Sequence, residues 1–245
     1  MIIIDKLQNP ETIKSIFFDI DGTITRWKSV ESFLKRALSE LNMPYKEEYL
    51  NALFRAIKMN EYHTLTTGFL DEEVYANLLG IYIPDLNKYG LTGNDLKNIM
   101  FKLEDEETFI DEGTLEELSF LHEEYDLYCY TNWFKAQAVK KLEYHNLLKF
   151  FLEVHSPEDV FIKQHAFAFK YILEKYKLKP EQILFVGDSR TDIKPSKKCG
   201  IKTIYINYDI KSDDDITKDS MDLILRADAS ITNFNDIHVV LSKKY

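Results

Sequence analysis

The chain has 245 residues, 45% of them hydrophobic and 29% charged, which suits one large core or a core with a smaller second domain. Its formal net charge of −10 repels polyphosphate backbones, so the composition argues against general nucleic-acid binding. The N-terminal run MIIIDKLQNP is too short for a signal-peptide core and no run reaches the length of a membrane span, which predicts a cytoplasmic protein with no membrane partner.

The first predicted strand, residues 15–20, runs into the stretch FFDIDGTIT and ends on two acids before a glycine. Asp19 and Asp21 are two residues apart, so on an extended chain their carboxylates would point to the same face and repel one another. We therefore expect a cation to compensate for this pair.

A helical insert is predicted from residue 26 to residue 112, a region in which no run has the pattern of a strand. Helical periodicity covers the ranges 30–42, 47–60, 71–79 and 93–107. Because the insert leaves after the first strand and returns before the second, it is expected to cap the carboxyl ends of the strands. Several polar residues near an expected turn of the cap could face the site: Arg55, Lys58, His63, Thr66 and Thr67.

The remaining chain alternates predicted strands and helices. Short apolar runs predict buried strands at 125–131, 150–156, 182–188 and 202–207. Amphipathic segments predict helices at 113–125, 134–148, 166–178 and 192–200. This alternation predicts a doubly wound, Rossmann-like α/β core with a parallel sheet. The expected domains are a catalytic core of 1–25 and 113–245 and a helical cap of 26–112.

Polar residues follow the predicted strands: Asp19, Asp21, Thr131, Asn132, Lys163, Asp188 and Asp192. The carboxyl ends of parallel strands meet at one edge of a sheet, where unpaired acids would be destabilising. Asp19 and Asp188 offer the oxygen ligands that Mg²⁺ prefers, and a backbone carbonyl of the turn would add another. Lys163 and the Thr131 hydroxyl could then stabilise phosphoryl oxygens while Asp19 attacks phosphorus.

On these residues the chain resembles the haloacid-dehalogenase-like hydrolase superfamily, whose phosphatases use an aspartate nucleophile. The four motifs occur in order as DIDGT at 19–23, YTN at 130–132, Lys163 with its following helix, and GDSRTD at 187–192. The insert is similar to the cap of the subgroup that includes phosphoglycolate phosphatase and β-phosphoglucomutase.

The resemblance implies a role for each matching residue. Asp19 would be the nucleophile, Asp21 the general acid/base, and Mg²⁺ would bind the Asp19 and Asp188 carboxylates and the Asp21 main-chain carbonyl. The implied phosphate-binding residues are Gly22, Thr131, Asn132 and Lys163. Asp192 would hold a metal-bound water or orient Lys163. The sequence departs from the family after Lys163. It reads KQH at 163–165, whereas relatives commonly have a proline and then an acid after this lysine. Lys170 is therefore the alternative candidate for the lysine of the third motif.

The predicted function is the Mg²⁺-dependent hydrolysis of a small phosphorylated metabolite through an aspartyl-phosphate. Asp21 favours a phosphatase over a dehalogenase, because an alkoxide leaving group needs a proton. A phosphosugar mutase of the same superfamily and a phosphate-binding or regulatory module without turnover are the alternatives, although the large insert argues against a receiver-like module. No pattern in the sequence indicates an oligomeric state.

Overall fold

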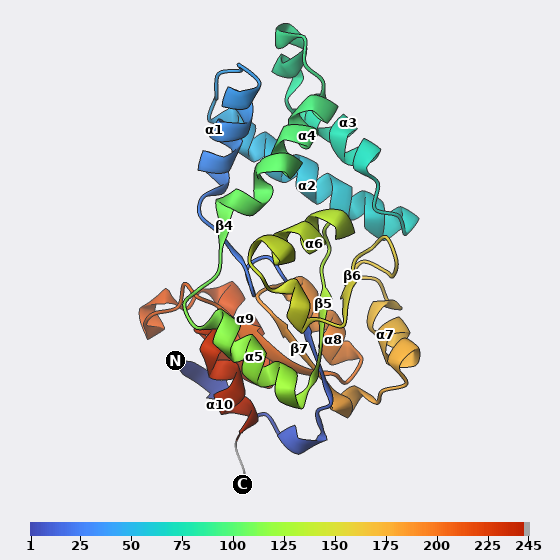
Figure 1. Ribbon diagram of the computed structural model, residues 1–245, viewed down its shortest axis with the longest axis vertical. Coiled ribbons are helices and arrows are strands. Elements are labelled where there is room, and N and C mark those ends of the chain that lie inside the picture. The colour runs from blue at the N-terminus through green and yellow to red at the C-terminus, as the bar shows by residue number, and fades with distance from the viewer. Residues whose placement is uncertain (243–245) are drawn as a thin grey trace.

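The computed structural model describes residues 1–242 and contains a seven-stranded sheet below a layer of helices (Figure 1). The strands lie in the order β1-β9-β8-β7-β2-β5-β6 and all neighbours are parallel except β1 and β9. Their bounds are β1 Ile2–Asp5, β2 Ser15–Phe18, β5 Asp126–Tyr130, β6 Glu153–His155, β7 Ile183–Gly187, β8 Lys202–Ile206 and β9 Ala229–Ile231. This arrangement confirms the predicted doubly wound α/β core.

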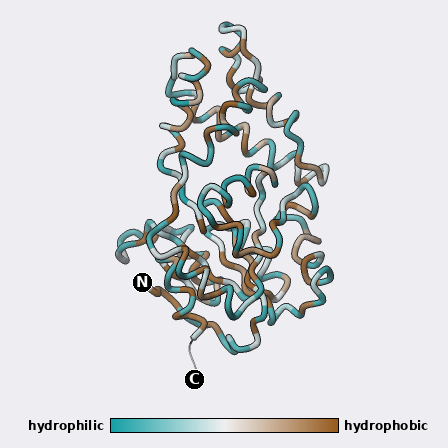
Figure 2. The backbone as a smooth tube through the Cα atoms, viewed as in Figure 1, coloured by the Kyte–Doolittle hydropathy of each residue, from teal (hydrophilic) through white to brown (hydrophobic). Residues whose placement is uncertain are grey.

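Helices cover both faces of the sheet. One face carries α5 (Thr114–Glu124), α6 (Lys135–Tyr144) and α10 (Ile237–Leu241). The other carries α7 (Ala168–Tyr176), α8 (Arg190–Lys198) and α9 (Lys218–Arg226). The strands are apolar on both sides, so brown segments gather in the lower half of Figure 2.

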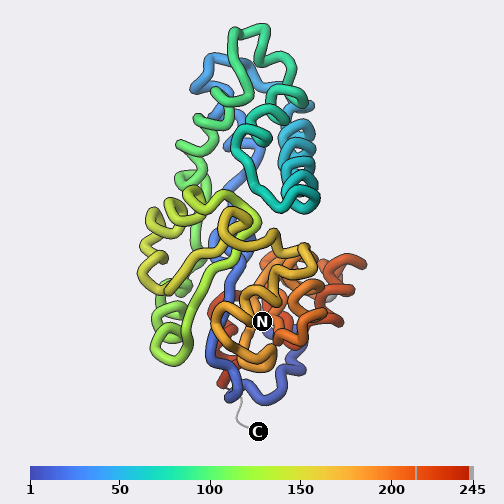
Figure 3. Tube along the Cα trace, turned by 90° about the vertical axis from the view of Figure 1, so that its right-hand side faces the viewer, coloured from blue at the N-terminus to red at the C-terminus, as the bar shows by residue number. Residues whose placement is uncertain are grey.

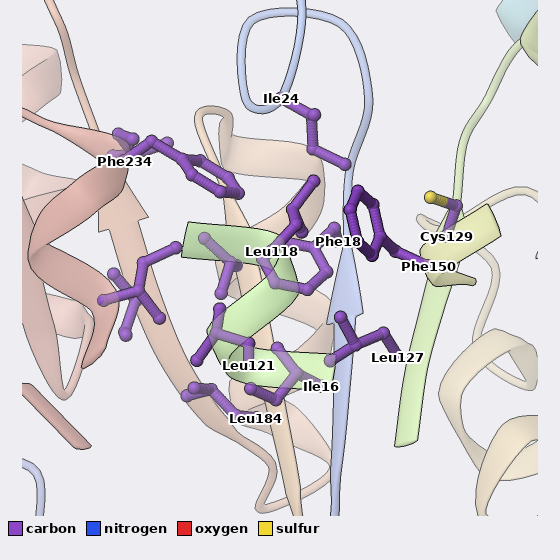
Figure 4. Close-up of a cluster of buried hydrophobic side chains, with 14 of the residues drawn as sticks. Ile16, Phe18, Ile24, Leu118, Leu121, Leu127, Cys129, Phe150, Leu184 and Phe234 are labelled. Carbon is purple, nitrogen blue, oxygen red and sulfur yellow. The ribbon is translucent and has the colours of Figure 1, made fainter. Parts of the chain in front are cut away.

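Alternation along β2 shows how this packing arises. Phe18 points to the same side as Leu118 and Leu121 of α5 (Figure 4), whereas Phe17 stacks on Tyr128 on the opposite side. Phe18 pairs in register with Cys129 of β5 and with Val186 of β7. The chain therefore leaves these three central strands at nearly the same level, which brings their carboxyl ends together.

The insert forms a cap of four α-helices with its own hydrophobic core. These are α1 (Val30–Glu40), α2 (Glu48–Thr67), α3 (Glu72–Tyr82) and α4 (Gly93–Leu103). Figure 3 shows the cap above the sheet and joined to it by two neighbouring segments. These segments pair as a short antiparallel ribbon of β3 (Arg26–Trp27) and β4 (Thr108–Phe109). Short 3₁₀ turns occupy Pro10–Thr12, Pro84–Tyr89, Glu104–Glu107, Leu148–Phe150, Pro180–Gln182, Asp213–Asp215 and Phe234–Asp236.

Two expectations for the cap region are wrong. The region from 26 to 112 does contain strands, because its two ends pair with each other as β3 and β4. The helix predicted over 47–60 continues to Thr67 and ends where Gly68 adopts a left-handed φ of 81°. The domain boundaries at 26 and 112 stay a prediction. Within residues 1–242, no helix is both long enough and apolar enough to span a bilayer.

Candidate active site

The turn after β2 positions the first predicted site residue. The Asp19 N–H still donates to the Val186 carbonyl of β7 at 2.9 Å, and the N–H groups of residues 23–25 then all donate to the Ile20 carbonyl. Gly22 takes a φ of 84°, a left-handed conformation that glycine adopts without strain. This tight turn holds Asp19 at the edge of the sheet, where it is 7% exposed.

Lys163 bridges a carboxylate that follows β2 and one in the first turn of α8. Its Nζ lies 2.5 Å from Asp19 Oδ1 and 2.5 Å from Asp192 Oδ1, and the residue is 2% exposed. The other Asp192 oxygen accepts from the N–H and the hydroxyl of Ser189 at the start of α8. Lys170, the alternative lysine, is exposed on α7. The structure therefore brings Lys163 rather than Lys170 to the acids.

Asp188 follows β7 and faces the turn at Gly22. A Cβ on Gly22 would lie 2.0 Å from Asp188 Oδ2, so a glycine is needed for this close approach. Carboxylate oxygens of Asp19, Asp188 and Asp192 lie within 4.8 Å of one another. Both Asp192 oxygens accept hydrogen bonds of 3.0 Å or less, whereas Asp19 Oδ2 accepts only a longer bond of 3.3 Å from the Thr23 hydroxyl, so Asp19 and Asp188 are the acids better placed to bind a metal. This oxygen-only donor set fits Mg²⁺.

Burial and crowding disfavour the charged forms of these acids. Burial raises the pKa of Asp19 to about 7, with the Lys163 ammonium opposing the rise and the Asp192 carboxylate adding to it. The pKa of Asp188 is raised by burial and by the Asp19 and Asp192 carboxylates. Burial lowers the pKa of Lys163, but the two carboxylates outweigh it and the net shift is upward. A divalent cation between Asp19 and Asp188 would favour their charged forms.

The end of β5 supplies Thr131 and Asn132. Thr131 is buried and its Oγ1 accepts from the Trp133 N–H at 3.0 Å, which leaves the hydroxyl hydrogen able to donate to a ligand. Asn132 Oδ1 accepts from the Lys163 N–H at 2.9 Å, and Asn132 Nδ2 donates to Gln164 at 2.9 Å. In this structure Asn132 thus fixes the segment that carries the lysine.

A buried ion-pair network holds Asp21. Lys141 of α6 is 0% exposed, and its Nζ lies 2.5 Å from Asp21 Oδ1 and 2.7 Å from Glu104 Oε1. Burial lowers the pKa of Lys141, yet the Asp21 and Glu104 carboxylates outweigh burial and raise it overall. The second Glu104 oxygen accepts from Trp133 Nε1 at 3.2 Å. The network therefore ties Asp21 to the segment that returns from the cap.

Lys141 and Glu104 were not predicted from the sequence, for different reasons. For Lys141 the spacing of apolar residues indicated a buried position. It follows Ala138 by three residues and directly precedes Leu142, and both of these are buried, so Lys141 falls on the apolar face of its helix. Glu104 lies in an acidic run, EDEE, in which no local pattern separates the buried acid from its exposed neighbours.

A cavity of about 410 Å³ lies between the strand ends and the cap. The residues that line it are Asp19, Asp21, Trp27, Ile57, Glu61, Glu104, Thr131, Asn132, Trp133, Lys163, Asp188, Ser189 and Thr191. Ile57 and Glu61 are one turn apart on α2, so they share the face that α2 presents to the site. A larger hollow of about 780 Å³ lies by Pro10 and Tyr125, near the amino ends of the strands, and contains none of these acids.

The cap residues expected near the site are not among those that line this cavity. Since α2 continues through the expected turn, Arg55, Lys58, His63, Thr66 and Thr67 are spread along a single helix. Arg55 lines a separate hollow in the cap, and the two threonine hydroxyls donate to the His63 carbonyl of their own helix. The expected turn was the wrong premise, and the charged residue of α2 that lines the cavity is Glu61, which was not among the residues expected there.

Several known proteins are similar to this chain in sequence. The sequence profile of a family described as haloacid dehalogenase-like hydrolase matches residues 16–206. The putative HAD-hydrolase YfnB of Bacillus subtilis is 28% identical over 206 residues, which cover 81% of this chain and 86% of YfnB. A phosphoglycolate phosphatase of Salmonella typhi is 25% identical over 246 residues, which cover 95% of this chain and 93% of the relative.

Solved structures share the fold. The crystal structure of YfnB bound to magnesium, described as revealing interdomain movement, has a TM-score of 0.72 at 23% identity and covers 94% of this chain and 99% of that one. A putative β-phosphoglucomutase from Thermotoga maritima has a TM-score of 0.66 at 16% identity, over 94% of this chain and 98% of that one. At these sequence identities the similarity is one of fold, namely the α/β core with its cap.

Proposed function

The chain belongs to the haloacid dehalogenase-like hydrolase family, and on this premise we propose that it is a Mg²⁺-dependent phosphatase acting on a small phosphomonoester. The observation that carries the proposal is the Lys163 ammonium, 2.5 Å from both Asp19 and Asp192, in a cavity also lined by Asp21 and Thr131. A carboxylate nucleophile, a second acid and a fixed cation are groups that phosphoryl transfer needs. The relative named phosphoglycolate phosphatase and the magnesium-bound structure support it.

In the proposed reaction Asp19 attacks phosphorus, so that a bond from its carboxylate oxygen forms as the bond to the substrate alcohol breaks. Lys163 and the Thr131 hydroxyl would bind the phosphoryl oxygens, and Asp21 would give its proton to the leaving alkoxide. Mg²⁺ bound by Asp19 and Asp188 would supply positive charge against the phosphate dianion. Asp21 would then take a proton from a water whose oxygen attacks phosphorus, which releases phosphate and frees Asp19.

Asp21 also separates this proposal from its alternatives. A dehalogenase has a halide leaving group that needs no proton, whereas Asp21 lines the cavity beside the nucleophile. A phosphosugar mutase would return the phosphoryl group to a sugar and release little free phosphate. A binding module without turnover would release neither product. Free phosphate from a metabolite ester therefore distinguishes a phosphatase, for which we also propose a cytoplasmic location.

The proposal is tested by measuring phosphate release from p-nitrophenyl phosphate and a panel of phosphorylated metabolites. We expect turnover with Mg²⁺, none in EDTA, and none from the Asp19→Asn variant, because an amide is a negligible nucleophile and a weaker metal ligand. Asp214→Asn, which alters an exposed aspartate, is the matched control and should keep full activity. Undiminished turnover in EDTA, or by Asp19→Asn, would contradict the proposal.

A further inference from the structure

Glu61 is an acid of the cavity to which the proposed reaction gives no role. It lies on α2, and with Ile57 it lines the cavity from the cap, whereas residues such as Asp19 and Asp188 line it from the strand ends. Among residues 1–242 its carboxylate has no hydrogen-bond or ion-pair partner. Burial raises the pKa of Glu61, against the pull of the Lys163 and Lys58 ammonium groups. A half-buried carboxylate without a partner favours a ligand that can donate a hydrogen bond to it.

The buried cations near the cavity are already engaged by other acids, and Lys58, one turn from Glu61 on α2, is exposed to water. Lys163, the only lysine or arginine among the lining residues, lies 2.5 Å from each of two carboxylates. Lys141, behind the lining, lies within 2.7 Å of two others. A Mg²⁺ ion would be balanced by the acids that bind it and by the phosphate dianion. The end of the cavity at Glu61 therefore keeps a negative charge.

Two indole side chains line the same cavity and are held by their own contacts. The Trp27 ring packs against Lys141, whose Nζ is 5.1 Å from the ring centroid. Trp133 donates its Nε1 hydrogen to Glu104 at 3.2 Å. The two rings offer flat apolar surface in the cavity that the Glu61 carboxylate also lines, a combination that suits an uncharged organic group better than an anion.

We propose that Glu61 selects the alcohol part of the substrate. It accepts a phosphomonoester whose leaving group presents a hydroxyl or amine donor, and it rejects one that ends in a carboxylate, because a second anion would lie against an unbalanced charge. This inference rests on the proposed phosphatase function. It predicts that phosphoglycolate, the compound in the name of several relatives, is a poor substrate of this chain.

Three esters with the same two-carbon skeleton isolate the charge at the far end. They are phosphoglycolate, 2-hydroxyethyl phosphate and O-phosphoethanolamine, which end in a carboxylate, a hydroxyl and an amine. We measure kcat/KM by phosphate release with Mg²⁺, and the inhibition constant of each ester against p-nitrophenyl phosphate. The wild-type protein should favour the hydroxyl and amine esters over phosphoglycolate by about tenfold or more, the discrimination expected of a like-charge contact.

Variants of Glu61 should change this preference. Glu61→Gln should bring the three esters close to parity, and Glu61→Lys should reverse the order in favour of phosphoglycolate. Glu48→Gln removes the same charge about 20 Å away on the same helix and should leave the preference unchanged. Each readout is a ratio of kcat/KM values for two esters measured on the same variant. A general loss of activity lowers both values equally and leaves the ratio unchanged.

Two results overturn the inference and can be told apart from failure of the proposed function. If the wild-type protein uses phosphoglycolate as well as the other esters, Glu61 does not select the leaving group. If the preference survives in Glu61→Gln, another residue sets it. In both cases the hydrolysis of p-nitrophenyl phosphate remains. Its absence from the wild-type protein with Mg²⁺ would instead overturn the phosphatase proposal, and the inference with it.

Discussion

Asp19 and Asp21, only two residues apart, contact different lysines. Asp19 contacts Lys163 from the segment after β6, and Asp21 contacts Lys141 from α6. The sequence predicted that the two acids would crowd one another and need a cation. The Asp21 carboxylate does add to the rise in the Asp19 pKa, but each acid has its own lysine, because the chain turns at Ile20, whose carbonyl accepts from the N–H groups of residues 23–25. Two carboxylates in different surroundings can take different tasks, as the proposed nucleophile and acid/base roles require.

Lys163 is expected to carry most of the positive charge that the protein offers to the phosphoryl group. Lys163→Ala should lower kcat by about a hundredfold or more, the effect of removing one electrostatic stabiliser. Lys170→Ala, on the exposed face of α7, is the control and should retain activity. Steady-state kinetics on variants shown to be folded by circular dichroism make the measurement. A fall in kcat in Lys170→Ala but not in Lys163→Ala would show that Lys170, and not Lys163, binds the phosphoryl group.

Gly22 is expected to be essential because of its surroundings and not only its backbone. Gly22→Ala should abolish activity, since the new Cβ would lie 2.0 Å from Asp188 Oδ2 and displace that carboxylate. Gly68→Ala is a matched control, because Gly68 has a similar φ of 81° but nothing within 4 Å of the added carbon. It should cost about 1 kcal/mol of unfolding free energy through backbone strain and leave kcat unchanged. Equal activity in the two variants would contradict the close approach of Gly22 and Asp188.

At the scale of elements, Lys141 joins α6, the turn after β2 and the segment that returns from the cap. Lys141→Met should lower the free energy of unfolding by about 3–5 kcal/mol, because it leaves the Asp21 and Glu104 carboxylates without their cation. Adding Glu104→Gln should recover part of the loss, since it removes one of the unbalanced charges. Urea denaturation gives both values.

A surface ion pair provides the control for this prediction. Lys35 also pairs with an acid, Glu31, at 2.7 Å, but the two side chains are 50% and 45% exposed. Lys35→Met should therefore cost about 1 kcal/mol or less. Equal losses from the two lysine variants, or a deeper loss on adding Glu104→Gln, would show that the buried network does not stabilise the fold as described.

The elements differ in how well the sequence predicted them. The five parallel strands β2, β5, β6, β7 and β8 were found, because each is an apolar run bounded by polar or turn residues. The edge pair β1 and β9 was missed, since its pairing joins the two ends of the chain and leaves no local pattern in the sequence. The end of α2 was misplaced because polar residues up to Thr67 weaken its periodicity, although Gly68 marks its end.

At the scale of the whole molecule, the sequence predicted one side of the cavity and not the other. Asp19, Thr131, Lys163 and Asp188 were predicted to meet because parallel strands place their ends along one edge. Glu61 was not predicted, since which face of a cap helix meets the core depends on how two separately packed layers dock. That docking joins residues far apart in sequence and leaves no local pattern.

The stability of the whole molecule is expected to depend on pH through His155. This side chain is buried against Tyr176, whose hydroxyl is 2.7 Å from its Nε2, and burial lowers its pKa from 6.5 to about 4. The unfolded chain takes up a proton below 6.5 and the folded protein does so only near 4. This histidine therefore lowers stability as pH falls between these values, by up to about 3 kcal/mol.

Urea denaturation of wild type and His155→Gln between pH 4 and pH 7 tests this prediction. The stability of the wild type should fall more steeply with decreasing pH than that of the variant. His122→Gln, which removes an exposed histidine, should follow the wild type. Parallel curves for wild type and His155→Gln would show that His155 titrates alike in the folded and unfolded states.

The nucleophilic role of Asp19 is tested most directly by trapping the phosphorylated protein in the Asp21→Asn variant. With p-nitrophenyl phosphate and Mg²⁺, phosphorylation needs little acid help, but attack by water lacks its base. Rapid mixing should give a burst of p-nitrophenol approaching one per active site, followed by slow turnover. After acid quenching, mass spectrometry should find the phosphoryl group on the peptide that contains Asp19. A phosphoryl group on another residue, or turnover at the wild-type rate without a burst, would contradict the proposed mechanism.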